Sequence, residues 1–189
     1  MTSSISPSIC KLPRLSQHHH RRLEGHFRSH SALYFQLALR PNPRSHRNRI
    51  TGELPSDIGR VHRLTVPNIT DNLISGKIPP SITNLSSLMH LDLRNNRITD
   101  EIPRDFGQLT MLSRALINRN QIEGTIPDSI SKIHRLADLA LSLNWLSSTI
   151  PESLGRMAVL GTLNLDSNRI SGYISASLLA SSVSNCPDL

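Results

Sequence analysis

Apolar residues recur along most of this chain at a fixed interval of 24 residues. In each unit they occupy the first, fourth and sixth places, as in the segment from Leu88 through Leu91 to Leu93. Such residues point inward from a short strand while those between them face out, so stacked units would form a parallel sheet. An asparagine follows three places after the last apolar residue, and this asparagine column consists of Asn72, Asn96, Asn120, Asn144 and Asn168. The pattern predicts an α/β solenoid.

Turn residues repeat in the same register and predict the path between strands. The asparagine amide can satisfy backbone groups that a bending chain leaves unpaired. A glycine then lets the chain turn at little steric cost, although Asp100 and Ser148 take its place in two units. The proline that follows Ile in most units favours an extended chain and prevents a helix from starting. Apolar residues three apart in the return path, as in 80–85, predict a short 3-10 turn on the outer face.

The unit L-x-x-L-x-L-x-x-N-x-I-S-G-x-I-P resembles the plant-type leucine-rich repeat of receptor-like kinase ectodomains and polygalacturonase inhibitors. It more closely resembles the plant DNA-damage-repair/toleration leucine-rich-repeat proteins, through 59–66, 79–97, 129–139 and 157–168. This resemblance implies a right-handed superhelix with the parallel sheet on its concave face and 3-10 or loop segments on its convex face. It also implies a non-enzymatic, usually secreted glycoprotein with a cysteine-paired cap at each end.

The amino-terminal part of the chain has a different composition. Residues 1–49 hold nine Lys/Arg and a single acid, Glu24, so their net charge is +8. The remainder carries −1, and together they give the net charge of +7. We predict a disordered, basic, His/Arg/Ser-rich tail, and a near-neutral body offers no basic surface for nucleic acid. The predicted boundaries are 1–47 for the tail and 48–189 for the repeat domain, with a partial repeat 48–63, repeats 64–87, 88–111, 112–135, 136–159 and 160–182, and a truncated end 183–189.

Location is left open between two alternatives. The family resemblance favours the extracellular space or cell wall, although the apolar stretch 32–39 is a poor secretory signal and is too short to span a membrane. The Ser- and Arg-rich, acid-poor tail instead fits a plastid transit peptide.

One repeat before Leu64, the inward places would hold Arg40, Pro43 and Ser45, which cannot form a strand core. Our hypothesis is that the chain is a truncated or imperfect reading of a longer gene.

The motifs favour recognition over catalysis. The sequence has no phosphate-binding glycine loop, kinase signature, Gly-x-Ser-x-Gly or His-Glu-x-x-His. We therefore expect no enzyme, cofactor or metal, and instead a protein- or peptide-binding module in plant signalling, defence or cell-wall recognition. It would act as a monomer or within a larger receptor assembly. The alternatives are a plastid or nuclear protein linked to DNA damage tolerance, and a fragment of a receptor-like kinase ectodomain.

The outward strand places form the candidate concave binding surface, on the general rule that solenoids bind through this face. Six strands about 4.8 Å apart and about 16 Å long give about 400 to 500 Å², below the ~800 Å² per partner of a standard interface. A short peptide or a weak complex therefore fits better. Asn68 and Asn84 begin Asn-x-Ser/Thr sequons and are candidates for N-glycosylation. The candidate surface comprises His90, Asp92, Arg94, Arg114, Asn118, Arg119 and Asp138.

Overall fold

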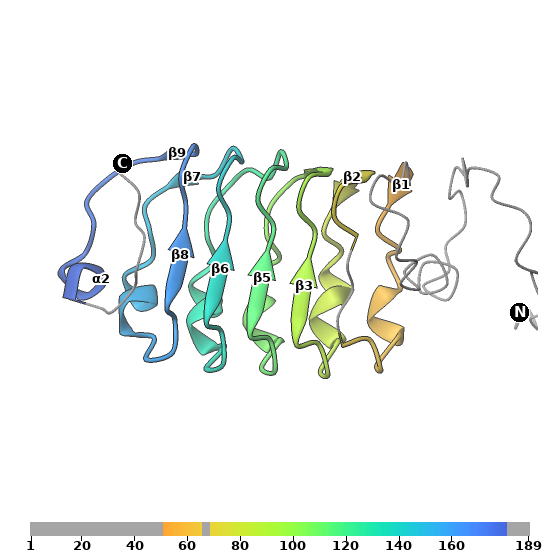
Figure 1. Cartoon of the computed structure of the whole chain (residues 1–189), viewed down its shortest axis with the longest axis horizontal. Coiled ribbons are helices and arrows are strands. Elements are labelled where there is room, and N and C mark those ends of the chain that lie inside the picture. Colours follow the sequence, from red (N-terminus) through yellow and green to blue (C-terminus); the bar gives the residue numbers. More distant parts are fainter. Residues whose placement is uncertain (1–50, 66–68, 181–189) are drawn as a thin grey trace, which may run out of the picture.

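The computed structural model describes residues 51–65 and 69–180, which wind into successive coils of one solenoid (Figure 1). The tail 1–47, the terminal segment 183–189 and Asn68 lie outside the described residues, so the predictions for them stay predictions. The strands are β1 (Thr51–Glu53), β2 (Leu73–Lys77), β3 (His90–Asp92), β4 (Arg97–Thr99), β5 (Arg114–Leu116), β6 (Asp138–Ala140), β7 (Ser147–Ser148), β8 (Thr162–Asn164) and β9 (Arg169–Ile170).

Strands β3, β5, β6 and β8 form a four-stranded parallel sheet, called here the main sheet. The register follows the repeat, since Arg114 pairs with Asp138 and Asp138 pairs with Thr162. Leu91 in β3 and Leu139 in β6 point into the core and are at most 1% exposed, whereas Asp138 and Ala140 on either side of Leu139 are only half-buried. The predicted solenoid with a parallel sheet is confirmed.

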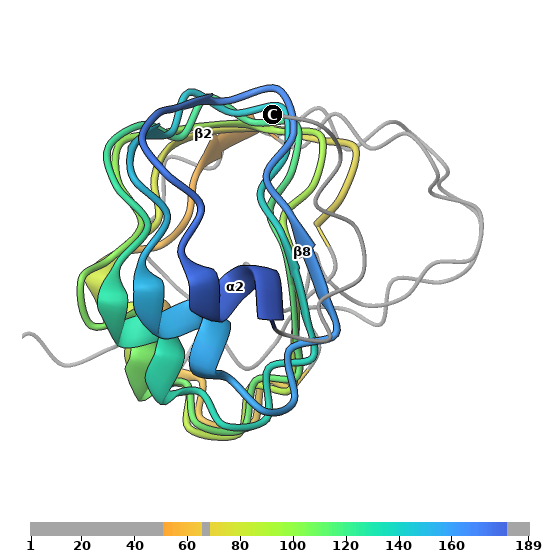
Figure 2. The same ribbon diagram turned by 90° about the vertical axis from the view of Figure 1, so that its left-hand side faces the viewer.

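The return path of each repeat contains a short helix on the side of the coil away from the main sheet (Figure 2). These segments have the 3-10 geometry predicted from the spacing of their apolar residues. Phe106 and Leu109 show why, because a side chain every third residue faces the core and both are fully buried. The helices are η2 (Ile58–Arg60), η3 (Pro80–Asn84), η4 (Phe106–Gln108), η5 (Asp128–Lys132) and η6 (Glu152–Arg156), and the α-helix α2 (Ala176–Ala180) follows at the carboxy-terminal side.

A second set of strands, which the sequence analysis did not predict, runs along the edge of the coil between the main sheet and the 3-10 helices. In it β1, β2 and β4 form one parallel sheet, and β7 and β9 form another. The paired residues follow directly after the asparagine column, where we expected only a turn. Ser75, for example, lies opposite Arg97. Each coil thus has three sides (Figure 2).

The turn that ends this second set of strands has the same backbone conformation whether or not glycine is present. Gly76 and Gly124 have φ of 71° and 77°, and Asp100 and Ser148 have φ of 67° and 75° at the equivalent places. Asp100 compensates by accepting a hydrogen bond from the Glu101 amide through its own carboxylate, at 2.9 Å. The stack of coils therefore imposes the turn, and glycine is only the residue that adopts it most easily.

Candidate functional site

The asparagine column joins each repeat to the one before it. Asn120 Nδ2 donates to the carbonyl of Ile117 in its own repeat, at 3.0 Å, and to the carbonyl of Leu93 in the preceding repeat, also at 3.0 Å. Its Oδ1 accepts a hydrogen bond from the Ile98 amide at 3.1 Å. The side chain is buried, so both ends of one amide satisfy backbone groups that water does not reach. These contacts occupy the asparagine side chains and leave them no binding role.

The same arrangement recurs along the solenoid. Asn96 donates to the Ile69 carbonyl at 2.9 Å and accepts from the Ile74 amide at 3.1 Å. Asn144 donates to the Ile117 carbonyl at 3.2 Å, and its Oδ1 accepts from Ile122 at 3.1 Å. This repetition fixes the direction in which the residues beside each asparagine point. The candidate surface is therefore a rigid array.

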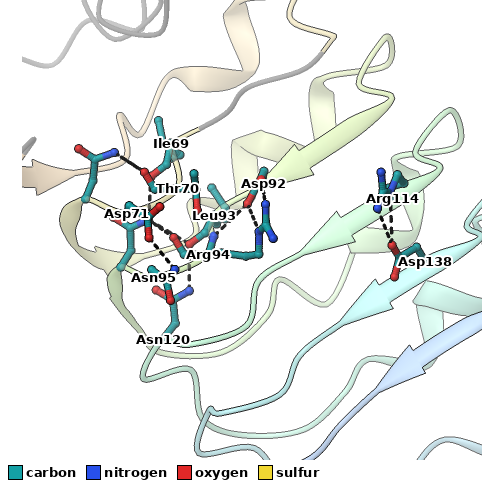
Figure 3. A network of polar contacts seen from close by, with 12 residues as sticks. Ile69, Thr70, Asp71, Asp92, Leu93, Arg94, Asn95, Arg114, Asn120 and Asp138 are labelled. Carbon is teal, nitrogen blue, oxygen red and sulfur yellow. Dashed lines mark hydrogen bonds and ion pairs between the residues drawn. The ribbon is translucent and has the colours of Figure 1, made fainter. Parts of the chain in front are cut away.

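The solvent-facing side of the main sheet, which points away from the core, carries an ordered set of ion pairs (Figure 3). Asp92 in β3 accepts two hydrogen bonds from the Arg94 guanidinium, from Nε at 2.8 Å and from Nη2 at 2.7 Å. Asp92 is only 9% exposed, whereas the Arg94 side chain is 41% exposed, so this two-pronged contact is partly shielded from water. The pKa of Arg94 is raised because its hydrogen bond to Asp92 outweighs the opposing effect of burial. The two-pronged contact therefore holds both side chains in a fixed arrangement.

A second ion pair crosses between adjacent strands of the same sheet. Arg114 in β5 donates through Nη2 to Asp138 Oδ2 in β6 at 3.0 Å, and through Nε to the same oxygen at 3.2 Å. The two residues are register partners. His90 is the register partner of Arg114 on the other side. Three of the predicted surface residues thus lie in one row across β3, β5 and β6 by register. Figure 3 shows the contact between Arg114 and Asp138.

The remaining predicted surface residues lie just beyond the strand ends. Asn118 is half-buried, and its carbonyl accepts a hydrogen bond from the Asn95 amide at 3.2 Å. Arg119 is exposed and sits at the bend with φ of 58°, at the place equivalent to Asn95 and Asp71. Those two residues are linked side chain to side chain at 2.6 Å. Arg119 thus lies at the bend three residues after β5, and its part in the candidate concave surface stays a prediction.

Short side chains lie next to the charged row on the carboxy-terminal half of the main sheet. Ala137 precedes Asp138 and Ala140 follows it two places later, and the following repeat places Gly161 and Thr162 alongside. Leu116 at the end of β5 is half-buried and borders Ala140 in the register. The sequence analysis did not include these residues because it selected charged and amide side chains. Apart from Leu116, these residues could have been selected from the sequence, because they are small residues at outward places.

The candidate glycosylation site Asn84 ends η3 on the outer turn of its coil. Its side chain and that of Ser86, the hydroxyl residue of the sequon, are both exposed. Glycosylation of Asn84 stays a prediction.

Within the described ranges, no group of three or more His, Cys, Asp or Glu side chains could hold a metal ion. None of the helices described is long and apolar enough to cross a membrane.

Comparison with known proteins shows which family model and which solved structures this chain resembles. The family model described as Leucine Rich Repeat matches residues 87–109. The solved structures that resemble the chain include the ectodomain of the membrane receptor kinase GASSHO1/SCHENGEN3 from Arabidopsis thaliana, with 35% sequence identity and a TM-score of 0.68 over 70% of this chain. The fold is a leucine-rich-repeat solenoid. Its structural neighbours include ectodomains of plant leucine-rich-repeat receptor kinases.

Two further neighbours describe complexes. The Arabidopsis receptor kinase HAESA, solved with the peptide hormone IDA and the co-receptor SERK1, is 33% identical with a TM-score of 0.71 over 76% of this chain. The BIR3–SERK2 complex from Arabidopsis thaliana is 28% identical with a TM-score of 0.58; the match covers 73% of this chain and 69% of that one. The present chain spans only 16% and 24% of the GASSHO1/SCHENGEN3 and HAESA chains.

No curated protein matches the chain at a significant level. The narrower resemblance to the DNA-damage-repair/toleration proteins therefore receives no support from these comparisons, and it stays a prediction. The broader resemblance to plant receptor-like ectodomains is supported by the structural neighbours.

Proposed function

We propose that the chain is a non-enzymatic recognition module that binds a peptide or an extended protein segment on the solvent-facing side of the main sheet. The observation that carries the proposal is the row formed by His90, Arg114 and Asp138, next to the preorganised Asp92 and Arg94 pair. Charged groups held in fixed positions favour a partner of complementary charge and reject others.

The shape of the surface favours an extended ligand. Long side chains on β3 and β5 stand beside the small residues Ala137, Ala140 and Gly161, so the sheet changes from charged to flat along the solenoid axis. A peptide crossing the strands would meet the ion pairs and, beside them, a half-apolar floor formed by Leu116 and Ala140. Peptide hormones occupy the solved complexes of HAESA and RGFR1, which share this fold. Roles in plant signalling or defence and an extracellular location follow as part of the proposal.

Selection of peptides tests this function directly. A random 12-residue peptide library displayed on phage is selected against the full chain, and the affinity of the enriched peptides is then measured by calorimetry. We expect the double variant Arg94→Gln, Arg114→Gln to weaken binding by about tenfold or more, as truncation of central charged contacts does at other interfaces.

The matched control removes the same charge from the opposite side of the coil. Arg104 and Lys132 are exposed on the outer turns, so Arg104→Gln with Lys132→Gln should leave the affinity within about twofold. Equal losses in the two double variants would indicate general electrostatic attraction, and the proposed surface would then be rejected.

A further inference from the structure

Two exposed apolar side chains interrupt mostly polar columns at the rim of the solenoid. Leu143 is 41% exposed and Trp145 is 43% exposed, and they flank the buried Asn144 between β6 and β7. The repeats elsewhere show what these places ordinarily hold. The column of Leu143 contains Asp71, Asn95, Arg119 and Ser167, and the column of Trp145 contains Leu73, Arg97, Gln121 and Arg169. The fold therefore does not require an apolar residue at either place.

Leu143 also has an unfavourable backbone conformation. Its φ is 54°, in the left-handed region that asparagine and aspartate tolerate and that bulky apolar residues rarely adopt. The adjacent coil imposes this bend, because the Leu143 amide donates to the Asp166 carbonyl at 2.9 Å and its carbonyl accepts from Asn120 at 3.2 Å. A leucine that is 41% exposed here gains only part of the burial of a core leucine, and it costs conformational energy. A residue that is unfavourable for folding and exposed is a reason to look for a function.

Trp145 is held in place by a neighbouring cation. The guanidinium carbon of Arg169 lies 5.5 Å from the centroid of the indole ring. Such a contact restricts the ring, so little side-chain entropy would be lost when a partner covers it. Exposed tryptophan and arginine are the side chains that most often dominate binding energy at protein interfaces.

Two arginines border the apolar pair without a described ion-pair partner. Arg119 precedes Leu143 by one repeat, and Arg169 follows Trp145 by one repeat. Within 51–65 and 69–180 the ion pairs involve Arg94, Arg114 and Arg156 instead. The nearby acids Glu123 and Asp166 are exposed, and Asp166 accepts a hydrogen bond from Ser167 Oγ at 3.0 Å. Both Arg119 and Arg169 can therefore pair with an incoming carboxylate.

We infer that these four residues form a second docking surface, the rim patch, consisting of Arg119, Leu143, Trp145 and Arg169. Its partner is a protein segment that presents an apolar or aromatic side chain flanked by acidic residues. The rim patch lies at the bend beyond the main sheet, so it is separate from the peptide surface proposed above, and a partner could occupy each at once.

The polar residues of the other repeats supply variants that should keep the fold. Leu143→Asn introduces the residue found at Asn95, and Trp145→Gln introduces the residue found at Gln121. The double variant of the full chain should unfold at the same denaturant concentration as the wild type or at a higher one. A loss of binding in this variant therefore reports on contact with the partner.

The test uses the random 12-residue phage library on the full chain, sorted for peptides that bind the wild type but not the Leu143→Asn, Trp145→Gln variant. We expect this class to contain acidic residues beside an apolar or aromatic one. It should bind the variant at least tenfold more weakly and keep its affinity for the Arg94→Gln, Arg114→Gln variant. Arg119→Gln with Arg169→Gln should also weaken it and reduce its salt dependence.

Three outcomes would overturn the inference. The first is that no enriched peptide is sensitive to the rim variant. The second is that the sensitive peptides lack acidic residues. The third is sedimentation showing that the wild type dimerises and the rim variant does not, because the occupant would then be a second copy of this chain. If no selected peptide is sensitive to the Arg94→Gln, Arg114→Gln variant, the proposed function is refuted, but the inference about the rim patch is unaffected.

Discussion

Adjacent residues at each bend of the solenoid differ completely in their roles. The asparagine column is the same in every described repeat, and its side chains donate hydrogen bonds to backbone carbonyls of the neighbouring coil. The residue just before each asparagine changes from Asp71 to Asn95, Arg119, Leu143 and Ser167, although its backbone conformation does not change. Constancy across the repeats therefore marks what holds the coils together. Variation at a constant geometry marks what is free to serve recognition.

Among changes at the bends, the largest effect on stability should come from the asparagine column. Asn120→Ala removes the donor to Leu93 and Ile117 and the acceptor for Ile98, leaving buried backbone groups unpaired. We expect a loss of about 3 kcal/mol in the free energy of unfolding, measured by urea denaturation of the full chain. The neighbouring change Arg119→Asn should stay within about 0.5 kcal/mol. Similar losses in the two variants would remove the distinction between the columns.

A smaller loss is expected where the outer turns touch. A Cβ added to Gly107 would collide with the backbone carbonyl oxygen of Ser129 in the next coil, so Gly107→Ala should cost about 2 kcal/mol, as overpacking does. Gly161 offers the matched control, because the nearest atom to its added Cβ is the Ala137 carbonyl oxygen at 3.7 Å. Gly161→Ala should be neutral in the same measurement. A stable Gly107→Ala variant would mean that the coils can move apart easily.

The rim should respond in the opposite direction. Leu143→Asn replaces an exposed leucine at positive φ with a residue that tolerates this conformation. The midpoint of urea unfolding should stay constant or rise, with a gain of up to about 1 kcal/mol. Leu141→Ala, two residues away and fully buried, should instead cost about 2 to 5 kcal/mol. Destabilisation by Leu143→Asn would show that Leu143 serves the fold, which would weaken the case for the rim patch.

The smallest effect on stability is expected at the surface ion pair. Arg114 is exposed, so breaking its contact with Asp138 by Arg114→Gln should change the free energy of unfolding by less than about 0.5 kcal/mol. The same substitution should lower the affinity for peptides selected on the main sheet, as measured by calorimetry. Unchanged affinity together with unchanged stability would exclude this ion pair from the binding surface.

Much of the architecture was predictable because each repeat position has one physical requirement. The inward residues and the asparagine column recur at the same interval, so the fold and the 3-10 return path could be predicted from spacing. The second set of strands was missed because β2 and β4 follow a bend, where glycine and asparagine indicate a turn. Those strands form only because neighbouring coils supply hydrogen-bond partners, which no single repeat contains.

The candidate site was less predictable for a related reason. The charged residues of the main sheet could be selected from the sequence, but the pairing of Arg94 with Asp92 instead of Asp71 depends on how the chain bends after β3. Arg119 was grouped with the sheet because its place in the repeat is next to Asn118, and the structure places it at the left-handed bend three residues after β5. Leu143 and Trp145 could have been found by comparing columns for residues that break their own pattern.

Hydrogen–deuterium exchange of the full chain, with and without a peptide selected on it, tests the central claim most directly. For a peptide selected on the main sheet, the account predicts slower exchange at β3, β5 and β6, with the outer turns η4 and η5 unchanged. Protection concentrated on the 3-10 helices, with the main sheet unaffected, would contradict the assignment of recognition to the residues that vary at fixed geometry.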